Sequence, residues 1–170
     1  KNRHLGFENP RTQEPYARTG VAQMIFSDMG TESIAKKRGF SAYTWIRDEL
    51  IRMGVPSSEI TFMQNHKSSV ARAKVFTETN EGKISFLIGS TSNMGTGANA
   101  QQRLRALHHL DVPWLVADLM QREGRIRRQG NQNELIDIYA YATQGSLDAT
   151  SWQRLQQKAG LIRVAFSGDS

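Results

Sequence analysis

Residues 121–130 carry the side chains best suited to bind an anionic ligand, in the sequence QREGRIRRQG. The spacing predicts a helix from about residue 116 to 128, with Gly130 placed to end it. One face of that helix would hold an amide, a glycine and two guanidinium groups, from Gln121, Gly124, Arg125 and Arg128. Arginine binds phosphate through paired hydrogen bonds, and neighbouring arginines repel each other unless an anion lies between them. The face is therefore a candidate polyphosphate site, although a solvated basic helix fits the spacing equally well.

A second candidate site is the small, polar segment of residues 89–99, GSTSNMGTGAN. Gly95 and Gly97 would let a ligand approach the backbone, while Ser90, Thr91 and Asn99 offer groups that bind phosphate or ribose. The segment has neither the lysine of a Walker A loop nor the third glycine of a dinucleotide fingerprint. By itself it is more typical of an ordinary turn.

Apolar runs of strand length alternate with amphipathic runs along the chain. Strands are expected at residues 21–26, 59–62, 83–88, 106–110 and 135–141, and helices at 42–53, from Ser68 or Ser69 to about 80, at 116–128 and after Ser146. This alternation predicts an α/β fold, a parallel sheet with helices on both faces. Ligands bind at the carboxyl ends of parallel strands, and both candidate segments follow a predicted strand.

The composition is that of an ordinary globular domain, with 38% hydrophobic and 22% charged residues among 170. The net charge of +6 fits a nucleic-acid or nucleotide partner. Lys36, Lys37 and Arg38 could contact a phosphate backbone, although such a trio is more often solvated surface. Cysteine is absent, which excludes disulfides and thiolate metal sites and suits a reducing cytoplasm. No apolar run is long enough to cross a membrane, so no membrane partner is expected.

The paired histidines do not predict a metal site. His108 and His109 lie on a predicted strand, so their side chains would point to opposite faces of the sheet. They could not easily bind one metal ion, and buried neutral histidines are the better interpretation. We therefore expect no metal ligands in this chain.

Taken together, the two candidate segments resemble motifs of the superfamily-two helicases. Residues 89–91 with 95–99 resemble motif V, residues 121–128, with the pattern QxxGRxxR, resemble motif VI, and residues 24–27 stand where motif IV is expected. Their order resembles the second RecA-like lobe of the Swi/Snf-type DNA translocases. The runs RLxALHHLDxPW at 103–114 and RQGN at 128–131 are similar to the helicase region of very large phage- and plasmid-borne proteins, which often join a helicase to an adenine-specific DNA methyltransferase.

The resemblance implies a three-layer RecA-like domain with a parallel sheet. Residues 21–145 would form the helicase C-terminal lobe, with a linker or lead-in at 1–20 and a helical extension at 146–170. The Walker A lysine and the carboxylates that bind Mg²⁺ belong to the first lobe, which this sequence does not contain. The first residue is lysine rather than methionine, and we expect a fragment of a longer protein.

The resemblance also implies a role for each candidate residue. Arg125 and Arg128 would reach the γ-phosphate of ATP across a cleft, with Arg128 at the arginine-finger position and Gln121 ordering the same site. Other residues beside the nucleotide would be Gly95, Gly97, Asn99 and Gly124. The DNA phosphate backbone would be held by Ser27, Ser90 and Thr91.

The expected partners are DNA, the first RecA-like lobe of the same polypeptide and possibly a DNA methyltransferase domain, with ATP and Mg²⁺ bound in the parent protein. The chain alone is expected neither to bind ATP tightly nor to hydrolyse it. Two other functions stay open: a nucleic-acid-binding module without catalysis, and an interaction scaffold in a DNA modification or anti-restriction assembly.

Overall fold

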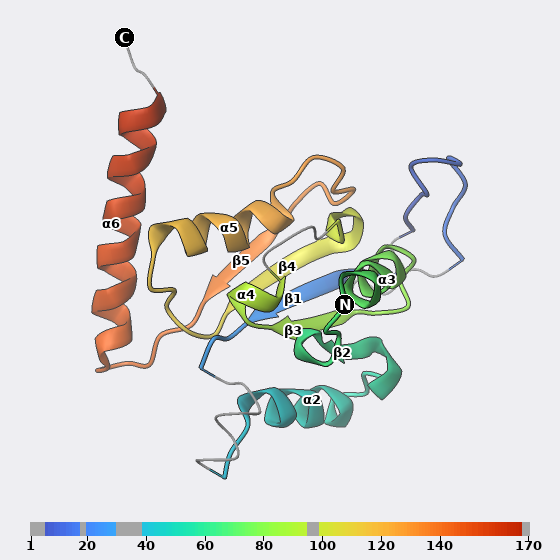
Figure 1. The fold of residues 1–170 in the computed structure, drawn as a ribbon, viewed down its shortest axis with the longest axis horizontal. Helices are drawn as coiled ribbons and strands as arrows, with labels where there is room; N and C mark the ends of the chain where they lie inside the picture. Colours follow the sequence, from blue (N-terminus) through green and yellow to red (C-terminus); the bar gives the residue numbers. More distant parts are fainter. Residues whose placement is uncertain (1–5, 18–19, 30–38, 95–98, 168–170) are drawn as a thin grey trace.

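A computed structural model describes residues 6–17, 20–29, 39–94 and 99–167. Among these residues it contains one sheet of five parallel strands in the order β2-β3-β1-β4-β5 (Figure 1). The strands are β1 (Ala22–Phe26), β2 (Ile60–Phe62), β3 (Phe86–Gly89), β4 (Leu104–His109) and β5 (Asp137–Ala140). In the register, Phe26 pairs with Gly89 on one side and with His109 on the other, so the strands end at the same level. The segments that follow the strands therefore meet at one edge of the sheet.

Helices cover both faces of the sheet, because successive strand residues point to opposite sides. On one face, Ile25 and Ile88 pack against Tyr43 of α2 (Ala42–Arg52). On the other face, Met24, Phe26 and Leu87 form a core with three helices, α3 (Ser69–Asn80), α4 (Thr91–Met94) and α5 (Val116–Ile126). Ser41 and Ser68 cap α2 and α3 by accepting the backbone N–H groups of Thr44 and Ala71. The predicted three-layer α/β architecture is confirmed.

The helix that carries the arginines ends earlier than the sequence predicted. α5 stops at Ile126 rather than near residue 128, and Arg128 lies in the turn that follows. The side chain of Asn131 explains the end, because its Nδ2 donates to the carbonyls of Ile126 at 2.9 Å and Leu104 at 2.8 Å. Gly130 has a φ of +91° and makes the later turn. The predicted common helical face therefore does not include Arg128.

Residues 6–17, which belong to the predicted linker or lead-in, pack against the domain. Phe7 is buried, and the guanidinium of Arg103 lies 4.9 Å from the centres of both the Phe7 and Tyr16 rings. Glu8 and Gln132 exchange two hydrogen bonds, with Glu8 N donating to Gln132 Oε1 at 2.9 Å and Gln132 Nε2 donating to Glu8 O at 2.6 Å. These contacts hold the lead-in against Arg103, which precedes β4, and against Gln132, which precedes β5.

The last helix, α6 (Leu147–Ser167), stands at one side of the molecule next to α5 (Figure 1). Trp152 and Leu155 are buried against Leu119 of α5, with Ala159 partly buried beside them. Farther along α6, Leu161 and Val164 are exposed. α6 thus packs on the lobe through its first half. Among the described residues, no helix combines the length and apolarity that a membrane crossing requires.

Candidate functional site

Arg122 lies at the centre of the edge where the strands end. It is fully buried, and its Nη2 donates to Asp28 Oδ2 at 2.6 Å and to Asp111 Oδ1 at 3.2 Å. Its Nε donates to Thr91 Oγ1 at 2.8 Å, and Nη1 lies 3.2 Å from the carbonyl oxygen of Asp111. The guanidinium also lies over the ring of Phe26, with its carbon 5.3 Å from the ring centre. We call these five residues the Arg122 network.

The two carboxylates of the Arg122 network extend it to the backbone. Asp111 Oδ2 accepts the N–H groups of Asp28 and Met29 at 2.5 Å and 2.9 Å. Asp28 accepts the N–H of Thr91 at 2.7 Å and its hydroxyl at 2.9 Å. Asp28 follows β1, Thr91 opens α4 after β3, and Asp111 follows β4. One arginine on α5 therefore fixes the chain beyond three strands through charge-assisted hydrogen bonds.

Arg122, Asp28 and Asp111 are not among the candidate residues predicted from the sequence. A signal for Arg122 was present, because it lies three residues after Leu119 and four before Ile126, which are both buried on α5. An arginine in the apolar stripe of a helix must find carboxylates inside the protein. The sequence holds no comparable signal for which carboxylates those are.

The hydroxyl groups predicted to hold DNA lie together at this edge but are buried. Ser27 donates its hydroxyl to Asp111 Oδ2 at 3.1 Å, and Ser90 Oγ lies 3.0 Å from Ser92 Oγ. Thr91 belongs to the Arg122 network. Lys36, Lys37 and Arg38 lie outside the described residues. Within the described residues, these hydroxyls support the ends of the strands.

The residues predicted at the nucleotide lie along α5 and the turn after it. Gln121 and Gly124 are exposed, and a Cβ at Gly124 would meet nothing within 4 Å. Arg125 is half-buried, and burial, followed by the nearby charge of Arg128, lowers the pKa of its guanidinium. Its Nε is buried without a hydrogen-bond partner among the described residues. A buried N–H of a cation favours an anionic acceptor.

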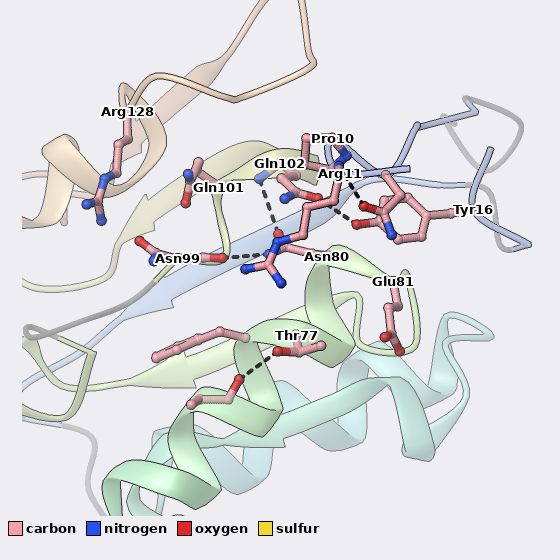
Figure 2. A pocket seen from close by; sticks show the side chains of 13 residues that line it. Pro10, Arg11, Tyr16, Thr77, Asn80, Glu81, Asn99, Gln101, Gln102 and Arg128 are labelled. Carbon is pink, nitrogen blue, oxygen red and sulfur yellow. Dashed lines mark hydrogen bonds between the residues drawn. The ribbon is translucent and has the colours of Figure 1, made fainter. Parts of the chain in front are cut away.

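The two candidate segments meet beside a pocket of about 640 Å³. Asn99 and Arg128 both line it, and in Figure 2 Asn99 lies below Gln101 while Arg128 lies to its left. Gly95 and Gly97 lie outside the described residues. Of the predicted nucleotide-binding residues, the structure therefore brings together Asn99 and Arg128, with Arg125 near Arg128.

The two adjacent histidines have different surroundings on opposite faces of β4, as predicted. His108 lies 2.9 Å from both Tyr141 Oη and Gln23 Oε1, and burial lowers its pKa. His109 is 1% exposed between Phe26 and Trp152. Burial, together with Arg122, lowers the pKa of His109 to about 4. His109 is therefore neutral at pH 7, and its approach of 4.0 Å to Glu123 is not an ion pair there.

The described residues do not fit a metal site of their own. They contain no group of three or more histidine, aspartate or glutamate side chains that could hold a metal ion. The carboxylates of Asp28 and Asp111 both pair with Arg122.

Comparison with known proteins identifies the family. The model of the helicase conserved C-terminal domain matches residues 31–130. The chain belongs to this family. Its sequence is 30% identical over 106 residues to Defense against restriction protein B of Escherichia phage P1, a match that covers 62% of this chain and 5% of the phage protein. The resemblance to a large phage protein is thus confirmed.

A solved structure shows the same fold for this helicase C-terminal lobe. The C-terminal part of the Fun30 ATPase domain superposes with a TM-score of 0.59 at 18% identity, covering 78% of this chain and 38% of that one. The likeness confirms the RecA-like architecture. The chain spans only a small part of the phage relative and well under half of the Fun30 structure.

Proposed function

We propose that this chain is the second motor lobe of an ATP-dependent DNA helicase or translocase. The observation that carries the proposal is the pair Arg125 and Arg128, in which a half-buried cation with an unpartnered Nε lies close to a second cation. Such a pair is stabilised by a polyphosphate between two lobes. Arg125 and Arg128 would donate to the γ-phosphate as charge develops on it, and Gln121 would order the same site.

The Arg122 network supports this proposal, because it links the helix that is proposed to contact ATP with the sheet edge that is proposed to bind DNA. Arg122 lies on the helix that bears Arg125 and contacts Thr91 and Asp28 at the strand ends. A movement of α5 on nucleotide hydrolysis would therefore be transmitted to the edge where DNA is proposed to bind. There Ser27, Ser90 and Thr91 would shape the backbone that meets the DNA phosphates.

The proposal extends to the parent protein. We infer that it carries a first lobe with the ATP-binding and Mg²⁺-binding residues, and that the cycle of closure moves one lobe along DNA. The name of the phage relative refers to defence against restriction. A role in that setting, with a DNA methyltransferase as a partner, is part of the proposal for the parent.

The test is ATP hydrolysis by a polypeptide that joins this lobe to its first lobe. Arg125→Ala and Arg128→Ala should each lower the DNA-stimulated turnover strongly, by about 10³-fold or more, because arginine fingers contribute on this scale. The matched control is Arg127→Ala. Arg127 directly follows α5, is exposed, and pairs with Glu123 of that helix. Its turnover should stay near that of the wild type.

The isolated chain supplies the second arm of this test. It should show no DNA-stimulated ATP hydrolysis, because it lacks the residues of a Walker A loop. Wild-type turnover in the Arg125→Ala and Arg128→Ala variants would instead favour a nucleic-acid-binding module that does not use this site.

A further inference from the structure

The indole of Trp152 joins α6 to the ends of two strands. It is buried against His109, the last residue of β4, with the two ring centres 5.4 Å apart and the rings inclined at 63°. Its Nε1 donates to the carbonyl of Tyr141 at 3.2 Å. Tyr141 directly follows β5, and its own N–H donates to the carbonyl of His109 at 3.1 Å. One side chain of α6 therefore reaches both β4 and β5 at the edge where the strands end.

His109 continues this contact to Arg122, because its Nδ1 lies 3.4 Å from Arg122 Nη1. A guanidinium can only donate, so Nδ1 must be the acceptor. The pKa of about 4 keeps His109 neutral at pH 7, and its one ring proton is then on Nε2. That Nε2 is buried without a hydrogen-bond partner among the described residues, and Glu123 Oε1 at 4.0 Å is too distant to accept from it. The ring of His109 is therefore oriented by Arg122 and by the rings of Phe26 and Trp152.

α6 also contacts α5 directly, and the two helices lie next to each other in Figure 1. Trp152 and Leu155 pack on Leu119, which precedes Arg122 by three residues on α5. An apolar side chain is enough to cover Leu119, as Leu155 shows. The aromatic ring and the N–H of Trp152 add the contacts with the strand ends. Trp152 thus holds α5 in two ways, by packing on Leu119 and through His109 and Arg122.

We propose that Trp152 is a positioning residue for ATP hydrolysis by the motor lobe. Its ring holds His109 against Arg122, and this contact fixes the orientation of α5, the helix that carries Arg125. The inference rests on the proposed function, because it concerns how the arginines of that site are aimed. Trp152 itself is assigned no contact with the nucleotide. Docking of α6 on the strand ends is then a condition for fast turnover.

The first experiment measures DNA-stimulated ATP hydrolysis by the polypeptide that joins this lobe to its first lobe. Trp152→Ala should lower kcat about tenfold, because even a small misplacement of a catalytic group is costly. The KM for ATP should stay unchanged, since no side chain assigned to the nucleotide is removed. Trp152→Phe should restore most of the rate, because it keeps a ring against His109.

The matched control is Leu155→Ala. Leu155 is as buried as Trp152 and belongs to the same cluster with Leu119, but it carries neither a ring nor an N–H. Its loss removes packing between α6 and α5 and leaves the contact with His109 in place. Leu155→Ala should therefore lower kcat much less than Trp152→Ala does.

The second experiment compares NMR spectra of the isolated 170-residue chain and does not depend on catalysis. Trp152→Phe and Trp152→Ala should shift the amide signals of Arg122 and of Thr91, which accepts a hydrogen bond from Arg122. Leu155→Ala should shift the signals around Leu119 and leave that of Thr91 in place. A shift at Thr91 is expected only if the effect of α6 passes through the Arg122 network.

Equal losses of kcat in Trp152→Ala and Leu155→Ala would overturn the inference, because packing alone would then explain the rate. A wild-type kcat in Trp152→Ala would do so as well, and so would a Trp152→Phe variant as slow as Trp152→Ala. Circular dichroism shows whether each variant is folded. If Trp152→Ala is not folded, Trp152→Leu takes its place, because leucine fills much of the space without supplying a ring, and the same loss of kcat is expected.

A failure of this inference is distinguishable from a failure of the proposed function. A low kcat in Arg125→Ala together with a wild-type kcat in Trp152→Ala would reject the role of Trp152 and keep the motor lobe. A wild-type kcat in Arg125→Ala would reject the motor lobe itself. The NMR comparison would then still decide whether Trp152 acts on the Arg122 network.

Discussion

Arg122 shows how a single buried charge can hold several segments of a protein. Its guanidinium is fully buried and lies within hydrogen-bond distance of both Asp28 and Asp111. A pair of this kind adds little stability compared with apolar packing, but removing one partner leaves the others buried and uncompensated. The network therefore matters most for keeping α5 in register with the ends of the strands.

This arrangement predicts that substitutions of Arg122 and Arg127 lower the free energy of unfolding by very different amounts. Arg122→Met should lower the free energy of unfolding by about 3–5 kcal/mol, because Asp111 then lies buried without its cation. Arg122→Lys should lower it by less, since it keeps the charge but loses the paired geometry of the guanidinium. Arg127→Ala, which breaks only an exposed pair with Glu123, should cost about 0.5 kcal/mol or less. Urea denaturation of the three variants measures these values, and equal losses at the two positions would contradict the role of the network.

Among the elements, the junction of β3 and α4 has the tightest packing around a glycine. A Cβ at Gly89 would lie 2.9 Å from Met94 Cγ and 3.0 Å from Met63 Cβ. Both methionines are fully buried, so they have little room to move. Gly89 therefore allows α4 to return closely over the end of β3, which places Thr91 beside Arg122.

Two alanine substitutions should consequently have opposite effects. Gly89→Ala should destabilise the protein by about 1–3 kcal/mol, the usual cost of overpacking. Gly160→Ala should stabilise it by about 0.5–1 kcal/mol, because Gly160 lies within α6 with nothing within 4 Å of a new Cβ. Thermal unfolding of the two variants gives the comparison. A Gly89→Ala variant as stable as the wild type would show that α4 can shift without loss of stability.

The elements were largely predictable because their patterns are local. All five strands and the four longer helices lie where the periodicity placed them, and errors are confined to their ends. The end of α5 depends on Asn131, which also bonds to Leu104, and no local pattern encodes such a contact. β4 likewise begins at Leu104 rather than at residue 106.

The candidate site was less predictable, because its residues are assembled from distant segments. Arg125 and Arg128 stood out as a repeated charge, and the structure places them near each other. The burial of Ser27 and Thr91 could not be foreseen, since Ser27 bonds to Asp111, which follows it by 84 positions, and Thr91 bonds to Asp28 and Arg122.

At the scale of the whole molecule, the two adjacent histidines of β4 make stability depend on pH. The pKa of His109 is about 4 in the folded protein against an ordinary 6.5, and burial lowers that of His108 as well. Between these values the unfolded chain binds the proton and the folded chain does not. Stability therefore falls as the pH is lowered through this window.

The expected loss due to His109 is about 2 kcal/mol between pH 7 and pH 5. His109→Gln keeps an acceptor near Arg122 and cannot titrate, so its free energy of unfolding should change less over the same range. Urea denaturation of both proteins at the two pH values measures the difference. Equal losses in the two proteins would show that folding does not lower the pKa of His109.

The order of the strands also governs how the lobe can be made by a ribosome. β1 pairs with β3 and β4, β2 pairs with β3, and β1 and β2 do not pair with each other. The first half of the chain therefore emerges with both of its strands unpaired, and the sheet cannot start before β3 appears at Phe86. Met24, Ile25 and Phe26 remain exposed to chaperones and to neighbouring nascent chains until then. A ribosome that stalls before Phe86 holds an apolar strand for which no partner has yet been synthesised.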